Sequence, residues 1–140
     1  MIIACAHCHR KNRIDQDRLA QAPTCGACKQ PLFTDQPIPV TAAQFNAHAS
    51  ADLPLILDFW APWCAPCLQF AATFEKAAAA AGSKAQFLKI NTEDEQALAA
   101  RFGIRSIPTL MVLREGQEVT RVAGALPAGE FMKWVYEQLG

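Results

Sequence analysis

Three Cys-x-x-Cys pairs account for all six cysteines of this 140-residue chain, and they limit what the chain can fold into. The pairs are Cys5/Cys8, Cys25/Cys28 and Cys64/Cys67. The first two lie in residues 1–35, where hydrophobic residues lack a regular period and Arg, Lys, Gln and Asp are frequent. Such a segment cannot bury a core of its own and needs a covalent or metal link. The cysteine pattern therefore predicts a small cross-linked module followed by a longer region with its own core.

The N-terminus lacks the features of a targeting segment. Met1 to Ala6 is a short apolar stretch followed at once by His and Cys, whereas a secretory signal has a basic start and about 7–15 apolar residues. The apolar runs are also far shorter than the roughly 18 residues that span a membrane. We therefore expect a cytoplasmic protein without membrane association. In that compartment thiols stay reduced, so six cysteines favour metal binding or catalysis over structural disulfides.

The charge balance argues against nucleic acid as the main partner. The chain has 13 Lys plus Arg and 13 Asp plus Glu, and its 51% hydrophobic content is that of an ordinary globular protein. A zinc-ribbon nucleic-acid binder would rest only on Arg10, Lys11 and Arg13, and a charge run is usually a solvated face. We expect a monomer, because no large exposed apolar face is evident.

The first two cysteine pairs have the spacing of a structural zinc site. Cys5 and Cys8 are separated from Cys25 and Cys28 by residues 9–24, and two such tight turns can place four sulfurs tetrahedrally around one zinc ion. His7 and His9 are interpreted as surface residues because four thiolates already close the site, although one of them could replace a cysteine. Iron is less favoured in so polar a segment, and two structural disulfides conflict with the expected compartment.

The hydrophobic pattern changes after residues 35–39, which form a linker or the entry to a strand. Buried strands are predicted at 55–60, 87–90 and 109–113, with a fourth at 118–122 that completes an antiparallel hairpin. Helices are predicted after Thr41, over about 64–80, from Thr92 or Asp94 to Gly103, and from Pro127 onward. This order predicts an α/β sheet that is parallel at first and antiparallel at one edge. We expect two units, residues 1–36 and residues 37–140.

The third cysteine pair follows a buried strand and opens a helix. A thiolate at a helix N-terminus is stabilised by free N–H groups, so the pKa of Cys64 should fall from its usual value. The i, i+3 spacing places Cys67 on the same face. Cys64 could then attack a disulfide and Cys67 could resolve the mixed disulfide. Pro66 fits the first helical turn because it lacks an N–H. The alternatives are a structural thiol pair or half of a metal site.

The residues around this pair resemble the thioredoxin family over about residues 37–140. The resemblance is carried by Ile107-Pro108-Thr109 and by Phe59-Trp60-Ala61-Pro62-Trp63-Cys64-Ala65-Pro66-Cys67. It implies the thioredoxin fold, Cys64 as nucleophile, Cys67 as resolving cysteine, and a cis Pro108 that faces them. It also implies a protein-disulfide reductase that acts on protein disulfides and is recharged by an NADPH-dependent thioredoxin reductase.

Further residues take roles from the same resemblance. Asp58 interrupts an apolar strand, and burial of a carboxylate is costly and raises its pKa. The resemblance makes Asp58 the proton acceptor and donor for Cys67, with Lys89 as its partner; the alternative is a structural ion pair. It also implies a substrate groove formed by Trp63, Pro66, Ile107, Gly124 and Ala125.

Two positions depart from the family pattern. Ala65 replaces the usual Gly and should stabilise the helix start by up to ~1 kcal/mol. Leu68 replaces a basic residue, so the thiolate should be stabilised less. These departures affect the redox potential and some partner contacts, and leave the fold unchanged.

The whole chain resembles the zinc-containing bacterial thioredoxins of the second type. Asn12-Arg13-Ile14 and Pro31-Leu32-Phe33 extend the match into the first module. The module is expected either to release zinc on oxidation or to offer a docking surface. The alternative for the whole protein is a zinc-sensing or redox-sensing adaptor that mainly binds partners.

Overall fold

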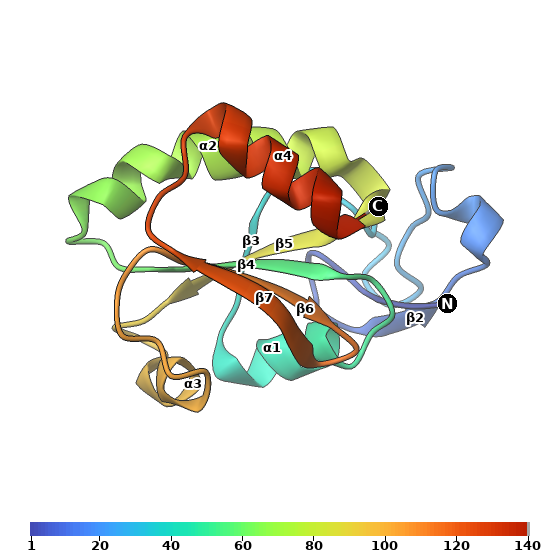
Figure 1. The fold of residues 1–140 in the computed structure, drawn as a ribbon. Helices are drawn as coiled ribbons and strands as arrows, with labels where there is room; N and C mark the ends of the chain where they lie inside the picture. Colours follow the sequence, from blue (N-terminus) through green and yellow to red (C-terminus); the bar gives the residue numbers. More distant parts are fainter. Residues whose placement is uncertain (140) are drawn as a thin grey trace.

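A five-stranded mixed sheet forms the centre of the protein in the computed structural model, which describes residues 1–139 (Figure 1). Across the sheet the strands are β3 (Ile38–Pro39), β5 (Gln86–Asn91), β4 (Leu55–Trp60), β6 (Thr109–Arg114) and β7 (Gln117–Ala123). β3, β5 and β4 run parallel, while β6 and β7 are antiparallel additions. The predicted parallel sheet with an antiparallel edge is confirmed.

Helices cover both faces of this sheet. They are α1 (Ala42–Ala49), α2 (Ala65–Ala81), α3 (Gln96–Arg101) and α4 (Ala128–Leu139), with short 3₁₀ turns at Gln16–Arg18 and Gly82–Lys84. α2 and α4 lie together on one face, and α1 and α3 lie on the other (Figure 1). Among these helices, none is both long and apolar enough to cross a membrane.

Alternation along the central strand separates two cores. Leu57 and Phe59 of β4 point to the α1 and α3 side, where Phe45 and Leu98 pack against them. Ile56 points to the α2 and α4 side and joins a cluster of phenylalanines and alanines. Successive strand residues face opposite sides, so Asp58 lies on the same face as Ile56, beneath α2.

Local sequence signals set the helix ends. Thr41 accepts a hydrogen bond from the Gln44 N–H while the Gln44 side chain accepts one from the Thr41 N–H, which is a capping box. α2 ends at Ala81, and its C-cap residue Gly82 has a φ of 57°, in the left-handed region that glycine tolerates.

α3 begins later than predicted. It starts at Gln96, after Glu95, and not at Thr92 or Asp94. The Asn91 side chain accepts from the Glu93 N–H at 3.0 Å and so holds a turn in this segment. The Thr92 hydroxyl donates to the Trp60 carbonyl at 3.0 Å, which ties the loop to the end of β4.

The N-terminal segment forms a second, two-stranded sheet of β1 (Ile2–Ala4) and β2 (Lys11–Arg13). This segment lies at one end of the main sheet (blue in Figure 1). Ile3 and Ala4 are fully buried there. The Asp52 N–H donates to the Ile2 carbonyl at 2.8 Å, and Lys11 Nζ donates to Ser50 Oγ at 2.8 Å.

Candidate redox centre and metal site

Cys64 and Cys67 form a disulfide at the start of α2, with their Cα atoms 5.2 Å apart. Cys64 is the N-cap residue of the helix, and its Sγ accepts a hydrogen bond from the Cys67 N–H at 3.2 Å. The exposed fractions are 5% for Cys64 and 2% for Cys67. The pair therefore sits where helix N–H groups stabilise negative charge on sulfur, and Cys64 is the more exposed of the two.

The segment before β6 lies against this disulfide. The Ile107–Pro108 peptide bond is cis, in agreement with the expectation from the family resemblance. The Ile107 carbonyl oxygen lies 3.9 Å from Cys64 Sγ. The Gly124 N–H donates to the Pro108 carbonyl at 2.8 Å, so Gly124 is held beside the same loop. Three of the predicted site residues are thus brought to the reactive pair.

A shallow pocket lies beside the disulfide. Trp63 is 67% exposed, and its indole N–H donates to the Glu93 carboxylate. Trp63 and Ile107 line a pocket of about 210 Å³ together with Thr92, Ala99, Ile104, Arg105 and Ser106. Pro66 and Ala125, also predicted for the groove, are exposed but lie outside the residues that line this pocket. Glu93 was missed from the sequence, because only the folded loops bring it to Trp63.

Asp58 is fully buried on β4, and burial raises the pKa of its carboxyl from 3.8 to about 7. The positive charge of Lys89 offsets part of this rise. Lys89 Nζ lies 4.5 Å from the centroid of the Trp60 ring, a cation–π contact. Asp58 and Lys89 are paired in register between β4 and β5.

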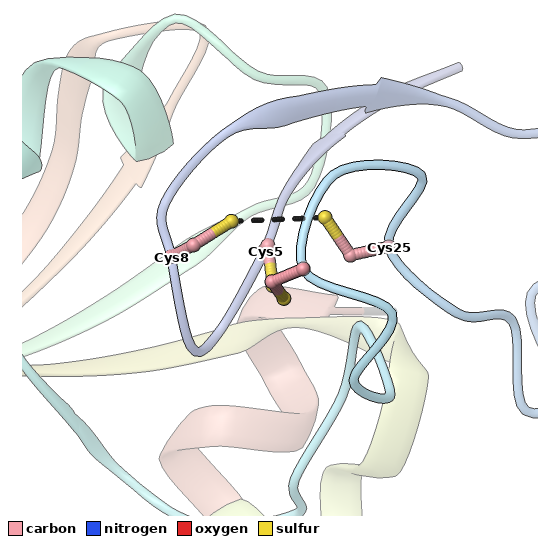
Figure 2. Close-up of side chains that lie close together, drawn as sticks. Cys5, Cys8 and Cys25 are labelled. Atoms are coloured by element: carbon pink, nitrogen blue, oxygen red, sulfur yellow. Dashed lines mark hydrogen bonds between the residues drawn. The ribbon is translucent and has the colours of Figure 1, made fainter.

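Four cysteine sulfurs form a separate cluster in the N-terminal segment. All four Sγ atoms lie within 4.8 Å of one another. The Cys5–Cys28 and Cys8–Cys25 Sγ distances are both 3.7 Å, and Figure 2 shows Cys8 and Cys25 facing each other across two loops. A tetrahedron of sulfurs about 2.3 Å from zinc has edges of about 3.8 Å. The donor set and its spacing therefore fit a tetrahedral metal ion.

Backbone donors surround these sulfurs. The His7 N–H donates to Cys5 Sγ at 3.3 Å, and the Ala27 N–H donates to Cys25 Sγ at 3.4 Å. Hydrogen bonds from the backbone, foremost at Cys28, lower the pKa of Cys25 to about 6. Burial raises the pKa of Cys5 to about 12. A metal bound here must therefore displace a proton from Cys5.

The interpretation of His9 as a surface residue is wrong. His9 is half-buried, and its Nδ1 lies 2.9 Å from Nε2 of the fully buried His48. His7 is exposed, as predicted. The contact was missed because His48 lies on α1, far from His9 in the sequence.

Comparison with known proteins decides the family. A sequence model of the thioredoxin family matches residues 36–137. The chain belongs to the thioredoxin family. A second family model, described as the N-terminal region of thioredoxin 2, matches residues 4–30. The four-cysteine segment is therefore a zinc ribbon of the thioredoxin 2 type.

Individual thioredoxins agree with this assignment. Thioredoxin C-3 of Corynebacterium nephridii is 41% identical over 99% of this chain and 96% of its own length. A thioredoxin of Haemophilus influenzae is 40% identical over 64% of this chain and 84% of its own length. A solved thioredoxin of Halobacterium salinarum superposes with a TM-score of 0.70 at 27% identity, covering 77% of this chain and 95% of that one.

The geometry and the family together establish the activity class. The protein is a thiol–disulfide oxidoreductase of the thioredoxin family, with Cys64 and Cys67 as its redox pair. Thioredoxins reduce protein disulfides and are themselves reduced by a thioredoxin reductase. In this chain the oxidoreductase is joined to a ribbon of four cysteines placed to bind a metal.

Proposed function

We propose that this protein reduces disulfides in other proteins, with Cys64 as nucleophile and Cys67 as resolving cysteine. The Cys64 thiolate attacks one sulfur of the substrate disulfide, which forms a mixed disulfide and releases one substrate thiolate. The Cys67 thiolate then attacks Cys64 Sγ, which forms the Cys64–Cys67 disulfide and releases the second substrate thiolate. Two electrons pass to the substrate. The N-cap position of Cys64, with the Cys67 N–H on its sulfur, is the observation that carries this order.

We propose that Asp58 accepts the Cys67 proton, so that the thiolate is available for the second step. Its pKa near 7 lets it gain and lose a proton at neutral pH. Its fully buried position beneath α2, the helix that carries Cys67, supports transfer through a bridging water. Lys89 tunes this carboxyl by its charge.

Substrate binding is proposed for the groove beside the disulfide. Trp63 and Pro66 form one rim, while Ile107, Gly124 and Ala125 form the other. Pro108 has no N–H, and the backbone of the half-buried Ile107 before it is proposed to pair with an extended substrate chain. The substrates proposed for this groove are proteins with an accessible disulfide.

The cellular setting follows from the same chemistry. We propose that an NADPH-dependent thioredoxin reductase restores the Cys64–Cys67 dithiol, and that the protein works as a monomer in the cytoplasm, where substrate disulfides are kept reduced. Residues 1–36 and residues 37–140 are proposed as its two structural units; β3 begins just after this division, at Ile38.

Zinc is the metal proposed for the four cysteines. Cys5, Cys8, Cys25 and Cys28 would hold one ion, and four thiolates leave no open position for catalysis. The ion would cross-link two loops that bury only a small cluster around Cys5, Cys25 and Leu32. The site is therefore structural, and oxidation of its thiolates would release the metal.

The decisive experiment couples insulin reduction to NADPH consumption through a bacterial thioredoxin reductase. Wild type should turn over, and Cys64→Ser should not. Cys67→Ser keeps the nucleophile and should accumulate a mixed disulfide with insulin, visible by non-reducing electrophoresis. Metal analysis of the same wild-type preparation should give about one zinc per chain. Turnover by Cys64→Ser, or trapping by Cys64→Ser and not by Cys67→Ser, would overturn the proposed order of attack.

A further inference from the structure

A buried chain of hydrogen bonds joins the zinc ribbon to the main sheet. His48 of α1 is fully buried, and its Nδ1 lies 2.8 Å from Oε1 of Gln86 on β5. The Gln86 Nε2 donates to the Ala4 carbonyl at 2.8 Å. At the other end of this hydrogen-bond chain, His48 Nε2 lies 2.9 Å from His9 Nδ1.

The two ends of this hydrogen-bond chain, Ala4 and His9, flank the first cysteine pair. Ala4 directly precedes Cys5, and His9 directly follows Cys8. We call residues 4–9 the first knuckle. The loop between its ends is closed by the His9 N–H, which donates to the Cys5 carbonyl at 3.0 Å. Gln86 therefore holds the backbone just before the two proposed metal ligands, and His48 holds the His9 side chain just after them.

The second knuckle, residues 24–29, has a similar backbone but is held from within the ribbon, where the Gly26 N–H donates to Asn12 Oδ1 at 2.9 Å. Within residues 1–139 it has no hydrogen bond to the main sheet or to α1. Lys29 has a φ of 67°, against 66° for His9, and its N–H donates to the Cys25 carbonyl at 3.0 Å. The Lys29 side chain is exposed and donates to the carbonyl of Gly26 at 2.7 Å, within its own knuckle. The two knuckles thus differ in what the side chain of the positive-φ residue contacts. His9 contacts His48 of α1, whereas Lys29 contacts Gly26 of its own knuckle.

The proton positions in this hydrogen-bond chain follow from the geometry of its members. A carbonyl oxygen only accepts, so the Gln86 amide donates to Ala4 and turns its oxygen toward His48. His48 Nδ1 must then be the donor to Gln86, and in a neutral His48 ring the bare Nε2 accepts from the His9 Nδ1–H. Burial lowers the pKa of His48 to about 4, which agrees with a neutral ring. The buried polar side-chain atoms of His48 and Gln86 all have partners in this hydrogen-bond chain, so removal of one member leaves another without a partner.

We propose that His48 and Gln86 are positioning residues for the metal site, which clamp the first knuckle so that Cys5 and Cys8 are already placed before the metal binds. A zinc site normally orders its ligands only as the metal binds. Here the main sheet orders one knuckle in advance, and the ion has only to hold the second knuckle against it. Zinc release should therefore depend on two side chains that lie outside the ribbon, His48 of α1 and Gln86 of β5. This inference rests on the proposed occupancy of the site by zinc.

The test measures zinc transfer from the reduced, zinc-loaded full chain to a chromophoric chelator. His9→Gly removes the imidazole while glycine tolerates the positive φ, and we expect release roughly tenfold faster than in wild type, as for the loss of one buried hydrogen bond. Lys29→Gly makes the matched change on the second knuckle. It should release zinc at close to the wild-type rate.

Variants of His48 distinguish positioning from general packing. His48→Phe keeps a ring but loses both bonds, and should match His9→Gly. His48→Gln places an amide near the Nε2 position, and should restore slow release. Lys11→Met removes a different contact between ribbon and main sheet, the bond to Ser50, and should leave release unchanged. Cobalt-loaded His9→Gly should show altered visible bands, which report the geometry of the four sulfurs.

The outcomes separate this inference from the proposed function. Equal release from His9→Gly and Lys29→Gly, or from His9→Gly and wild type, overturns the clamp while zinc binding stands. A reduced wild-type chain that carries no zinc overturns both. Should His48→Phe fail to fold, the comparison of the two glycine variants still decides the question, because both changes lie on exposed or half-buried loops.

Discussion

Asp58 lies directly opposite Lys89 where β4 pairs with β5, yet neither oxygen of its carboxylate receives a hydrogen bond from residues 1–139. Lys89 instead places its ammonium over the Trp60 ring. A buried carboxyl without a partner is costly in its charged form. The residue is therefore retained at a cost to stability, as expected for a group that serves proton transfer.

Stability should fall as Asp58 ionises. Its pKa is about 7 in the folded protein and 3.8 unperturbed, so the folded state binds more protons between these values. The free energy of unfolding should decrease as pH rises from about 4 to about 7, by roughly 4 kcal/mol at most. Asp58→Asn should lack this decrease, so the free energy of unfolding of the variant should rise relative to that of wild type toward about pH 8. Urea denaturation at several pH values measures it; parallel curves for the two proteins would contradict it.

Lys89→Met should raise the pKa of Asp58 above about 7, because the Lys89 charge lowers it. The pH dependence of insulin reduction should shift upward, and the Asp58 carboxyl resonance should titrate at higher pH. Lys76→Met removes an exposed lysine from α2 and is the control. A titration of Asp58 that is the same in Lys89→Met and Lys76→Met would show that the charge of Lys89 does not reach it.

Glu93→Ala should free the Trp63 indole at the groove. The KM for insulin should rise roughly two- to tenfold, as for the loss of one hydrogen bond, while kcat stays near the wild-type value. Glu137→Ala removes an exposed carboxylate from α4 and should change neither constant. A fall in kcat with an unchanged KM would place Glu93 in the chemical step and not in substrate binding.

Zinc affinity should increase with pH. Burial holds the Cys5 pKa at about 12 in the metal-free chain, so binding must release that proton, whereas Cys25, with a pKa of about 6, is already ionised at neutral pH. Competition with a chelator between about pH 6 and about pH 8 should show progressively tighter binding. Proton release on adding zinc to reduced protein gives an independent measure. Affinity that is flat across this range would argue against thiolate ligands.

Thr41→Ala should lower the free energy of unfolding by about 1 kcal/mol, because it removes the hydroxyl of the α1 capping box. Thr41→Ser keeps that hydroxyl and should remain close to wild type. Thermal and urea denaturation of the three proteins measure the effect. Equal losses in both variants would assign the role to the threonine methyl group and not to the cap.

The sheet and the redox centre could be predicted because their signals are local. An apolar run such as Leu55–Trp60 specifies a buried strand by itself, and the spacing of Cys64 and Cys67 carries the chemistry within one helical turn. The capping role of Thr41 is local in the same sense. What the sequence did not indicate depends on contacts between distant segments.

His9 and Glu93 illustrate that second class. Each is an ordinary polar residue in a loop, and only the folded chain shows that one contacts a buried histidine and the other an exposed indole. The late start of α3 has the same origin in part, since the Thr92 hydroxyl holds the loop to the end of β4 while Asn91 closes a local turn. Periodicity records which face is apolar, and it contains no information about such cross-loop bonds.

The burial of Ile3 and Ala4 bears on how such proteins can be recombined. A boundary near residue 36 invites the transfer of the ribbon as a cassette onto another thioredoxin. The first strand of that cassette has two fully buried residues, and its Ala4 carbonyl accepts a hydrogen bond from the Gln86 amide. A recipient without counterparts of His48 and Gln86 would leave this strand exposed and its polar groups unpaired. The ribbon therefore has to be transferred together with the residues that it packs against. These are His48 and Gln86, which lie some forty and eighty residues further along the chain than Ala4.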